Sequence, residues 1–251
     1  MTRLRCAAAL FALAWSAQQA HADEVTVAVA TNFAGPLAKI AESFKATTGH
    51  TLRASAGATG KFYTQIVAGG ALFELLIAAD DETPKKLIQS GHAVAGSQFT
   101  YAIGQLVLWS AQPGWVDSQG AILASGKFDH LAIANPKIAP YGRAAMDVLK
   151  ARGLADTLAP KIVSAESIAQ AYQFTVSGNA ELGFVALSQI AAPGKPALGS
   201  YWRVPQSLYG EIRQDAVLLK AGAQNPGAVA LLAYLKSAPA KAVIQAYGYG
   251  Q

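Results

Sequence analysis

Short apolar runs separated by segments of helical spacing dominate residues 23–251. Residues 25–30 and 72–79 are nearly continuously apolar, which is typical of strands buried on both faces of a parallel sheet. Between them lie a strand-like run at 51–54 and two segments whose apolar side chains recur every three or four residues. Three such strand–helix units in close succession predict an α/β fold with a parallel sheet.

The next run, residues 99–109, is rich in β-forming residues and carries Gly104 near its middle. It is longer than the five or six residues of an average strand. We interpret it as one long strand that crosses between two lobes and flexes at the glycine.

A second α/β pattern follows the crossing. Its strands are expected at 130–134, 161–163 and 182–186, its helices at 144–150 and 168–176, the return strands at 201–205 and 216–220, and the closing helices at 226–236 and 239–247. The predicted fold class is therefore α/β in two lobes, each a mixed, mainly parallel sheet flanked by helices.

The same pattern gives the expected division of the chain. Lobe 1 comprises residues 23–104 and 207–251, and lobe 2 comprises residues 105–206. Hinge crossings are expected near 102–106 and 204–212, where the chain passes from one lobe to the other.

Residues 1–22 are predicted to be a secretory signal peptide. Arg3 and Arg5 precede a short apolar run, and Ala20-His21-Ala22 fits an A-x-A cleavage site. The alternative is a membrane anchor, but the apolar run of about 11 residues is shorter than the roughly 20 that span a bilayer. We therefore expect a periplasmic protein, exported and cleaved after Ala22.

Composition narrows the possible chemistry. Cys6, the one cysteine, lies in the predicted signal peptide, which excludes disulfides and thiolate catalysis in residues 23–251. Those residues carry 18 Lys and Arg against 15 Asp and Glu, and Lys85-Lys86 is their longest basic run. We therefore expect no nucleic-acid partner.

Motifs for catalysis and metal binding are missing from the sequence. His50, His92 and His130 are far apart, and none belongs to an H-E-x-x-H pattern. Residues 57–62, Gly-Ala-Thr-Gly-Lys-Phe, superficially resemble a phosphate-binding P-loop. Their glycines are separated by two residues rather than four, and Phe62 replaces the required Ser or Thr. The sequence indicates no enzyme, no catalytic residue and no metal site.

Small polar residues and free backbone N–H groups recur instead where helices are expected to begin. The positions are Thr31-Asn32, Ala58-Thr59-Gly60, Tyr141-Gly142 and Ser167-Ile168. Each has an ordinary explanation as a helix N-cap. Their recurrence in both lobes favours a ligand-binding cleft, because helix N-termini suit anions.

Several longer segments carry a resemblance to a known family. They are Val-Ala-Thr-Asn-Phe, Gly-Ala-Thr-Gly-Lys-Phe-Tyr-Thr-Gln-Ile, Ile-Ala-Ala-Asp-Asp-Glu-Thr-Pro, Thr-Tyr-Ala-Ile-Gly-Gln-Leu-Val-Leu-Trp, Asn-Pro-Lys-Ile-Ala-Pro-Tyr-Gly-Arg-Ala-Ala and the closing Tyr-Gly-Tyr. The chain resembles the periplasmic molybdate-binding proteins of ABC transporters over about residues 24–250.

The resemblance implies a two-lobe periplasmic binding protein of type II that closes on molybdate or tungstate through uncharged donors. It implies ligands at Thr31 and Asn32, through hydroxyl, amide and backbone N–H, and at Thr59. Tyr141 and Ile168 are the implied contributors from lobe 2, Ile168 through its backbone N–H. The implied partners are the permease subunits of an ABC transporter in the inner membrane. No cofactor is expected, and the protein is expected to be a monomer.

Two departures from the family pattern concern the site. Ala186 stands where some members have a tyrosine, so a ligand hydroxyl is missing there, and Tyr141 is a candidate to supply it from the opposite wall. Thr59 stands in the place of a family serine and adds a methyl group close to the anion. Lys61 is expected to be solvated, and selection among oxyanions is expected to follow their size.

Three alternatives stay open on the sequence. The first is binding of another oxyanion or small solute, because a fold does not fix its ligand. The second is a ferric-ion receptor, for which Tyr247 and Tyr249 are the one close tyrosine pair. The third is an α/β enzyme acting on a phosphate ester, which requires a His, Asp or Glu within reach of Thr31 and Thr59.

Overall fold

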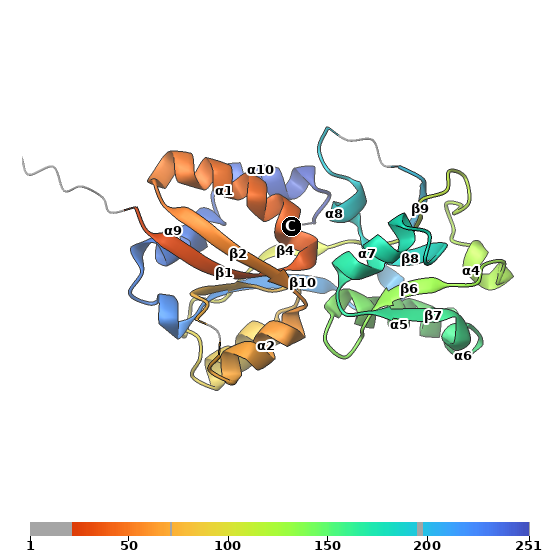
Figure 1. Ribbon diagram of the computed structural model, residues 1–251, viewed down its shortest axis with the longest axis horizontal. Coiled ribbons are helices and arrows are strands. Elements are labelled where there is room, and N and C mark those ends of the chain that lie inside the picture. Colours follow the sequence, from red (N-terminus) through yellow and green to blue (C-terminus); the bar gives the residue numbers. More distant parts are fainter. Residues whose placement is uncertain (1–21, 71, 195–197, 251) are drawn as a thin grey trace, which may run out of the picture.

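Two five-stranded sheets, each flanked by helices, form two lobes that lie side by side (Figure 1). The computed structural model describes residues 22–70, 72–194 and 198–250. The predicted signal peptide lies outside the described residues, apart from Ala22. Both sheets are mixed, as predicted.

The first sheet has the strand order β2-β1-β3-β10-β4. Strands β1 (Glu24–Ala30), β2 (Thr51–Gly57) and β3 (Leu75–Ile77) are parallel, whereas β10 (Ile212–Leu218) runs antiparallel between β3 and β4 (Phe99–Gly104). Because successive side chains of a strand point to opposite faces, Val27 and Val29 pack on one side and Ala28 on the other.

Helices cover both faces of this sheet. On one face, α1 (Ala34–Thr48), α9 (Pro226–Tyr234) and α10 (Ala238–Ala246) pack against a core that includes Phe33 and Phe44. On the other face lie α2 (Thr59–Val67) and α3 (Glu82–Gln89), which contribute Phe62 and Leu87. Burial on both faces explains why β1 and β3 are nearly all apolar.

The second sheet has the order β7-β6-β8-β5-β9. Its strands are β5 (Leu106–Ser110), β6 (Leu131–Ala134), β7 (Ile162–Ala165), β8 (Leu182–Ala186) and β9 (Ser200–Arg203). Strands β7, β6 and β8 are parallel, and β5 runs antiparallel to both β8 and β9. The helices of this lobe are α4 (Ile122–Ser125), α5 (Pro140–Ala151), α6 (Ala155–Leu158), α7 (Ile168–Val176) and α8 (Leu187–Ile190).

The run at 99–109 crosses between the lobes as expected, but the prediction of a single long strand is wrong. The chain forms β4 in the first sheet, breaks at Gln105 and continues as β5 in the second. Position 104 has no room for a side chain. A Cβ atom there would overlap the hydroxyl group of Tyr141 and lie 2.6 Å from Nε2 of Gln214. The glycine therefore lets two polar side chains meet beside the crossing.

Other element bounds differ modestly from the prediction. Strand β10 begins at Ile212, four residues earlier than expected. The apolar pattern did not show its first residues because Arg213 and Gln214 are polar, although both pair with β4. The one-turn helices α4, α6 and α8 are too short to show a helical period. No single helix among the described residues is long and apolar enough to span a membrane. Helices α9 and α10 reach that length and apolarity only as a pair, and the pair is bent by 59° at its junction.

Candidate functional site

Four helix N-termini, two from each lobe, meet around one small cavity between the lobes. Its lining within the described part of the chain consists of Ala30, Thr31, Asn32, Gly57, Ala58, Thr59, Ala79, Ala139, Pro140, Tyr141 and Ile168. All five candidate site residues from the sequence are in this set, and every lining residue is uncharged. The structure thus brings together residues that are up to 137 positions apart in the chain.

Three of the four helix starts carry no side-chain cap. The residue before the first helical position is Ala30 for the 3-10 turn η1 (Thr31–Phe33), which leads into α1, and it is Ala58 for α2 and Ala139 for α5. The side chain of alanine cannot accept a hydrogen bond. The backbone N–H groups of Asn32, Thr59 and Tyr141 therefore have no acceptor among the described residues, whereas that of Gly60 is taken by the carbonyl of Ile138. The N-cap explanation is therefore wrong for Thr31, Asn32 and Thr59. A ligand with acceptor oxygens would satisfy these groups.

Helix α7 differs because it has an ordinary cap. The hydroxyl of Ser167 accepts a hydrogen bond from the backbone N–H of Gln170 at 3.3 Å. Ile168 follows as the first helical residue, and its side chain is buried. Of the groups of Ile168, only the backbone N–H could therefore donate to a ligand in the cavity.

Thr59 presents a hydroxyl proton at the cavity. Its Oγ1 accepts a hydrogen bond from the backbone N–H of Ala79 at 3.0 Å, and the residue is 1% exposed. Because a hydroxyl both donates and accepts, this contact holds the oxygen in place and leaves its proton for a ligand. Thr31, at the mouth of the cavity, is only half-buried.

The expected role of the Asn32 side chain is wrong. Its Nδ2 donates to Oε1 of Gln214 at 2.9 Å and to the hydroxyl of Tyr249 at 3.0 Å, so both of its N–H bonds are used inside the protein. Sequence reasoning missed these partners because they lie 182 and 217 residues away. Asn32 retains only its backbone N–H as a donor for a ligand.

Tyr141 contributes from the second position of α5, where its backbone N–H belongs to the free first turn. Its hydroxyl accepts a hydrogen bond from Nε2 of Gln214 at 2.9 Å. Burial, and next the nearby Tyr249, raise the pKa of Tyr141 well above its ordinary value, so the hydroxyl keeps its proton. Ala186 is not among the residues that line the cavity.

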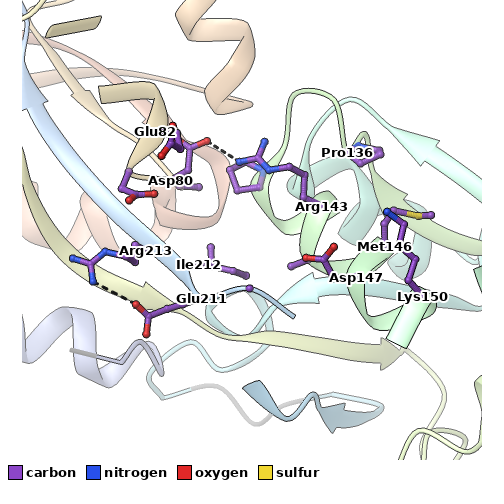
Figure 2. A pocket seen from close by; sticks show the side chains of 15 residues that line it. Asp80, Glu82, Pro136, Arg143, Met146, Asp147, Lys150, Glu211, Ile212 and Arg213 are labelled. Carbon is purple, nitrogen blue, oxygen red and sulfur yellow. Dashed lines mark hydrogen bonds and ion pairs between the residues drawn. The ribbon is translucent and has the colours of Figure 1, made fainter. Parts of the chain in front are cut away.

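Charged side chains surround the cavity without lining it. Lys61 is 57% exposed in its side chain and lies 3.6 Å from Glu166 of the other lobe, in agreement with the solvated Lys61 expected from the sequence. Arg143 on α5 reaches across to Asp80 and donates a hydrogen bond of 2.9 Å to its carboxylate (Figure 2). Both basic groups therefore have carboxylate partners outside the cavity.

A wider groove of about 480 Å³ is lined in part by Asp80 and Arg143 (Figure 2). It contains charged groups of both signs, among them Asp147 and Lys150 of α5 and the pair Arg213–Glu211 at 3.5 Å. Its acids outnumber its bases, five to three, so the groove is less suited to an anion than the uncharged cavity.

Direct contacts hold the lobes together around the cavity. The backbone N–H of Gly60 on α2 donates to the carbonyl of Ile138 at 3.0 Å, and the hydroxyl of Ser188 on α8 donates to the carbonyl of Asn32 at 2.9 Å. Together with the Arg143–Asp80 pair, these bonds define a closed arrangement of the two lobes.

Among the described residues no His, Asp or Glu lines the cavity, as an enzyme acting on a phosphate ester would require. His50 contacts Asp23, His92 contacts Ser90 and His130 contacts Glu181, and none lines the cavity. No group of three His, Cys, Asp or Glu in the described part of the chain is arranged to hold a metal ion.

The tyrosine pair considered for iron is divided between two structural roles. The ring of Tyr247 packs beside Gly35, whereas the hydroxyl of Tyr249 bonds with Asn32 and Ser188. The two phenols therefore do not form a joint metal site.

The cavity and the two-lobe fold define a class, that of solute-binding proteins that close over their ligand. The sequence pattern described as "Bacterial extracellular solute-binding protein" matches residues 25–250, and the chain belongs to that family. Within it, the chain is 58% identical over 231 residues to the molybdate-binding protein ModA of Azotobacter vinelandii, covering 92% of this chain and 91% of the relative. It is 50% identical to ModA of Rhodobacter capsulatus, over 98% of this chain and 96% of the relative.

A solved structure agrees with these relatives and confirms the predicted fold of a type II periplasmic binding protein. The periplasmic molybdate-binding protein of Azotobacter vinelandii superposes with a TM-score of 0.88 at 45% identity, covering 90% of this chain and 99% of the other. The relatives are named as binding proteins, which confirms the prediction of a binding protein rather than an enzyme.

Proposed function

We propose that this protein captures molybdate, or its near-isostere tungstate, in the cavity between its lobes and delivers it to an ABC transporter. The observation that carries the proposal is the meeting of four helix N-termini, three of them uncapped, around a small uncharged cavity. The names of relatives that are 50% and 58% identical support the same ligand.

A tetrahedral dianion fits a site made only of donors. Each helix N-terminus presents the equivalent of about half a positive charge. A hydrogen bond to a charged acceptor contributes about 1.5–3 kcal/mol net, so several such bonds offset part of the cost of removing water from the anion. Thr31 and Thr59 supply hydroxyl protons, and Asn32, Tyr141 and Ile168 supply backbone N–H groups.

Neutral donors also suit the empty protein. A lysine or arginine in the cavity would remain buried and unpaired whenever the ligand left, which is costly. Lys61 and Arg143 instead pair with carboxylates in their surroundings. The proposed site therefore attracts an anion without depending on a buried cation.

The ligand assignment is tested by titration calorimetry with molybdate, tungstate, sulfate and phosphate. We expect tight binding of molybdate and tungstate and much weaker binding of sulfate, because fixed donors spaced for a larger ion leave a smaller one underbonded. Phosphate that carries a proton needs an acceptor, which a donor-only site lacks. Binding of sulfate as tightly as molybdate would contradict the selectivity.

We further propose a periplasmic location, with residues 1–22 removed as a signal peptide, and delivery to permease subunits by a monomer. Lobe 1 is assigned to residues 23–104 and 207–251, and lobe 2 to residues 105–206, with the hinge in the two crossings. The similar protein from Azotobacter vinelandii is named as periplasmic, which supports the location. N-terminal sequencing of the exported protein should begin at Asp23, and a retained Met1 would refute cleavage.

Removal of the ion pair between the lobes should weaken ligand binding modestly. In an Arg143→Met variant the closed state loses its contact with Asp80, whereas the cavity lining is unchanged. Because the Arg143 side chain is 47% exposed, we expect molybdate affinity to fall only about two- to fivefold at low salt. The measurement is calorimetry at low and high salt, and the difference from wild type should shrink at high salt.

The matched control is Arg213→Met. Arg213 and its partner Glu211 lie on the same segment, so this pair does not depend on closure. An equal loss of affinity in both variants would show that net charge, rather than the contact across the cleft, determines the effect.

A further inference from the structure

A buried glutamine on the hinge-proximal strand connects both lobes to the cavity. Gln214 on β10 has no exposed surface, and it lies beside a register shift in the pairing of β10 with β4. An amide buried in this way is costly unless its groups are hydrogen-bonded. Its side-chain oxygen faces Asn32 and Tyr101, each at 2.9 Å, and its nitrogen faces Tyr141 at 2.9 Å.

The direction of these hydrogen bonds follows from the carbonyl oxygen of Asn32. This oxygen lies 2.8 Å from the hydroxyl of Tyr249 and 2.9 Å from that of Ser188. A carbonyl has no proton, so both hydroxyls donate to it. Tyr249 can then only accept from the Asn32 side chain, which therefore turns its NH₂ group toward Tyr249 and, with its second proton, toward Gln214.

The same reasoning extends to Tyr141. Because the NH₂ group of Asn32 donates to Gln214, the atom of Gln214 that receives it is the amide oxygen. The amide nitrogen of Gln214 therefore faces Tyr141 and donates to its hydroxyl oxygen. Tyr101 has one proton, which lies between the carbonyl of Ala78 and the oxygen of Gln214, both at 2.9 Å.

One hydroxyl proton of this network has no acceptor among the described residues, and it belongs to Tyr141. Tyr141 lines the cavity and is 1% exposed, so bulk water does not satisfy the proton. An oxygen atom of a ligand in the cavity would do so. Gly104 leaves the space in which the amide and the hydroxyl meet.

We propose that Gln214 is a positioning residue for the oxyanion. Its amide N–H donates to the hydroxyl oxygen of Tyr141, so the hydroxyl proton of Tyr141 points toward the ligand. The inference rests on the proposed function and adds a donor to it. Tyr141 then binds the anion twice, through its backbone N–H and its hydroxyl. The hydroxyl replaces the one that Ala186 cannot supply.

The first test reverses the polarity at Gln214. In a Gln214→Glu variant the ionised carboxylate only accepts, so Tyr141 donates to it and the anion loses a donor and gains a nearby negative charge. We expect molybdate affinity to fall at least about tenfold at neutral pH, since a bond to a charged acceptor is worth about 1.5–3 kcal/mol. Gln245→Glu, which makes the same charge change at an exposed glutamine of α10, should bind like wild type.

A pH series distinguishes positioning from a merely structural role. Burial raises the pKa of a carboxyl group, and the introduced carboxyl, once protonated, again has a donor for Tyr141 and an acceptor for Asn32. The affinity of Gln214→Glu should therefore recover as the pH falls from about 8 to about 5. The neighbouring tyrosines, Tyr101, Tyr141 and Tyr249, have pKa values raised by burial and stay neutral throughout this range.

A second variant covers the case in which Gln214→Glu does not fold. Tyr141→Phe removes only the hydroxyl, and we expect about tenfold weaker binding of molybdate with the backbone N–H intact. Gln214→Met should cause a smaller loss in the Tyr141→Phe background than in wild type. The part that acts through the hydroxyl is then already absent, and only the part that acts through Asn32 and Tyr101 remains.

The outcomes separate this proposal from the previous one. Tight binding by wild type with unchanged affinity in Tyr141→Phe would overturn the positioning role and leave the proposed function standing. Additive losses in the double variant would also overturn it. A wild-type protein that binds none of the tested oxyanions would overturn both.

Discussion

A Gly60→Val variant should bind molybdate about tenfold or more weakly than wild type, while the stability of the ligand-free protein stays the same. Gly60 lies at the start of α2, where the lobes touch backbone to backbone. A Cβ atom there would lie 3.0 Å from both Cα and the carbonyl oxygen of Ile138 in the other lobe. The branched side chain holds the lobes apart, and overpacking of this kind costs about 1–3 kcal/mol.

The cost applies only to the closed state, because Ile138 belongs to the opposite lobe. An open protein does not experience the clash, so thermal unfolding without ligand should be unaffected. Calorimetry measures the affinity, and small-angle scattering should show less compaction on addition of molybdate than in wild type.

Gly70→Val is the matched control. Gly70 follows the same helix, and a Cβ atom there would meet nothing within 4 Å. We expect wild-type affinity and compaction from it. Wild-type affinity in Gly60→Val would show that the close approach of Gly60 to Ile138 is not part of the ligand-bound state.

The sequence predicted much of the fold because its strands are buried on both faces. Runs such as residues 25–30 are recognisable without knowledge of their partners, and short loops after them indicate strand–helix units. The exact course of β10 was less accessible. Its first residues, Arg213 and Gln214, are polar, and their strand conformation depends on pairing with β4, more than 100 residues away.

The candidate site was found from local signals, since a helix start is a local feature of the chain. A further local signal lies one residue earlier: Ala30, Ala58 and Ala139 each precede the first residue of a helix. The N-cap position of a helix is usually Ser, Thr, Asn or Asp. Where alanine stands there instead, the free N–H groups of the first turn require another acceptor, which indicates a ligand.

The hydrogen-bond network behind the cavity could not be predicted from the sequence, because its contacts are not local. Gln214 and Ser188 carry no local motif, and the sequence drew attention to Tyr249 only within the closing Tyr-Gly-Tyr segment and as one of a tyrosine pair for iron. Their roles arise from contacts across 61 to 217 residues, which only the folded chain brings together. These contacts also explain why Asn32, correctly placed at the cavity, uses its side chain for support rather than for the ligand.

A Gly142→Ala variant should lose both folding stability and molybdate affinity, because Gly142 allows α5 to pack closely against the end of β6. A Cβ atom at this position would overlap the carbonyl oxygen of Ala134. The helix must shift to relieve the overlap, and the shift displaces the neighbouring Tyr141 from the cavity. We expect urea unfolding to show a loss of about 1–3 kcal/mol, reduced by the better helix propensity of alanine, and calorimetry to show at least about tenfold weaker molybdate binding.

Gly35→Ala tests whether the clash, rather than the loss of a helical glycine, causes these effects. Gly35 occupies the second position of α1, and a Cβ atom there would lie 3.4 Å from the ring of Tyr247, an ordinary van der Waals contact. Alanine gives the unfolded chain less backbone freedom than glycine does. This variant should therefore be as stable as wild type or slightly more stable. If Gly142→Ala behaved in the same way, α5 would not depend on close packing against Ala134, and the position of Tyr141 at the cavity would have to be fixed by its contact with Gln214 alone.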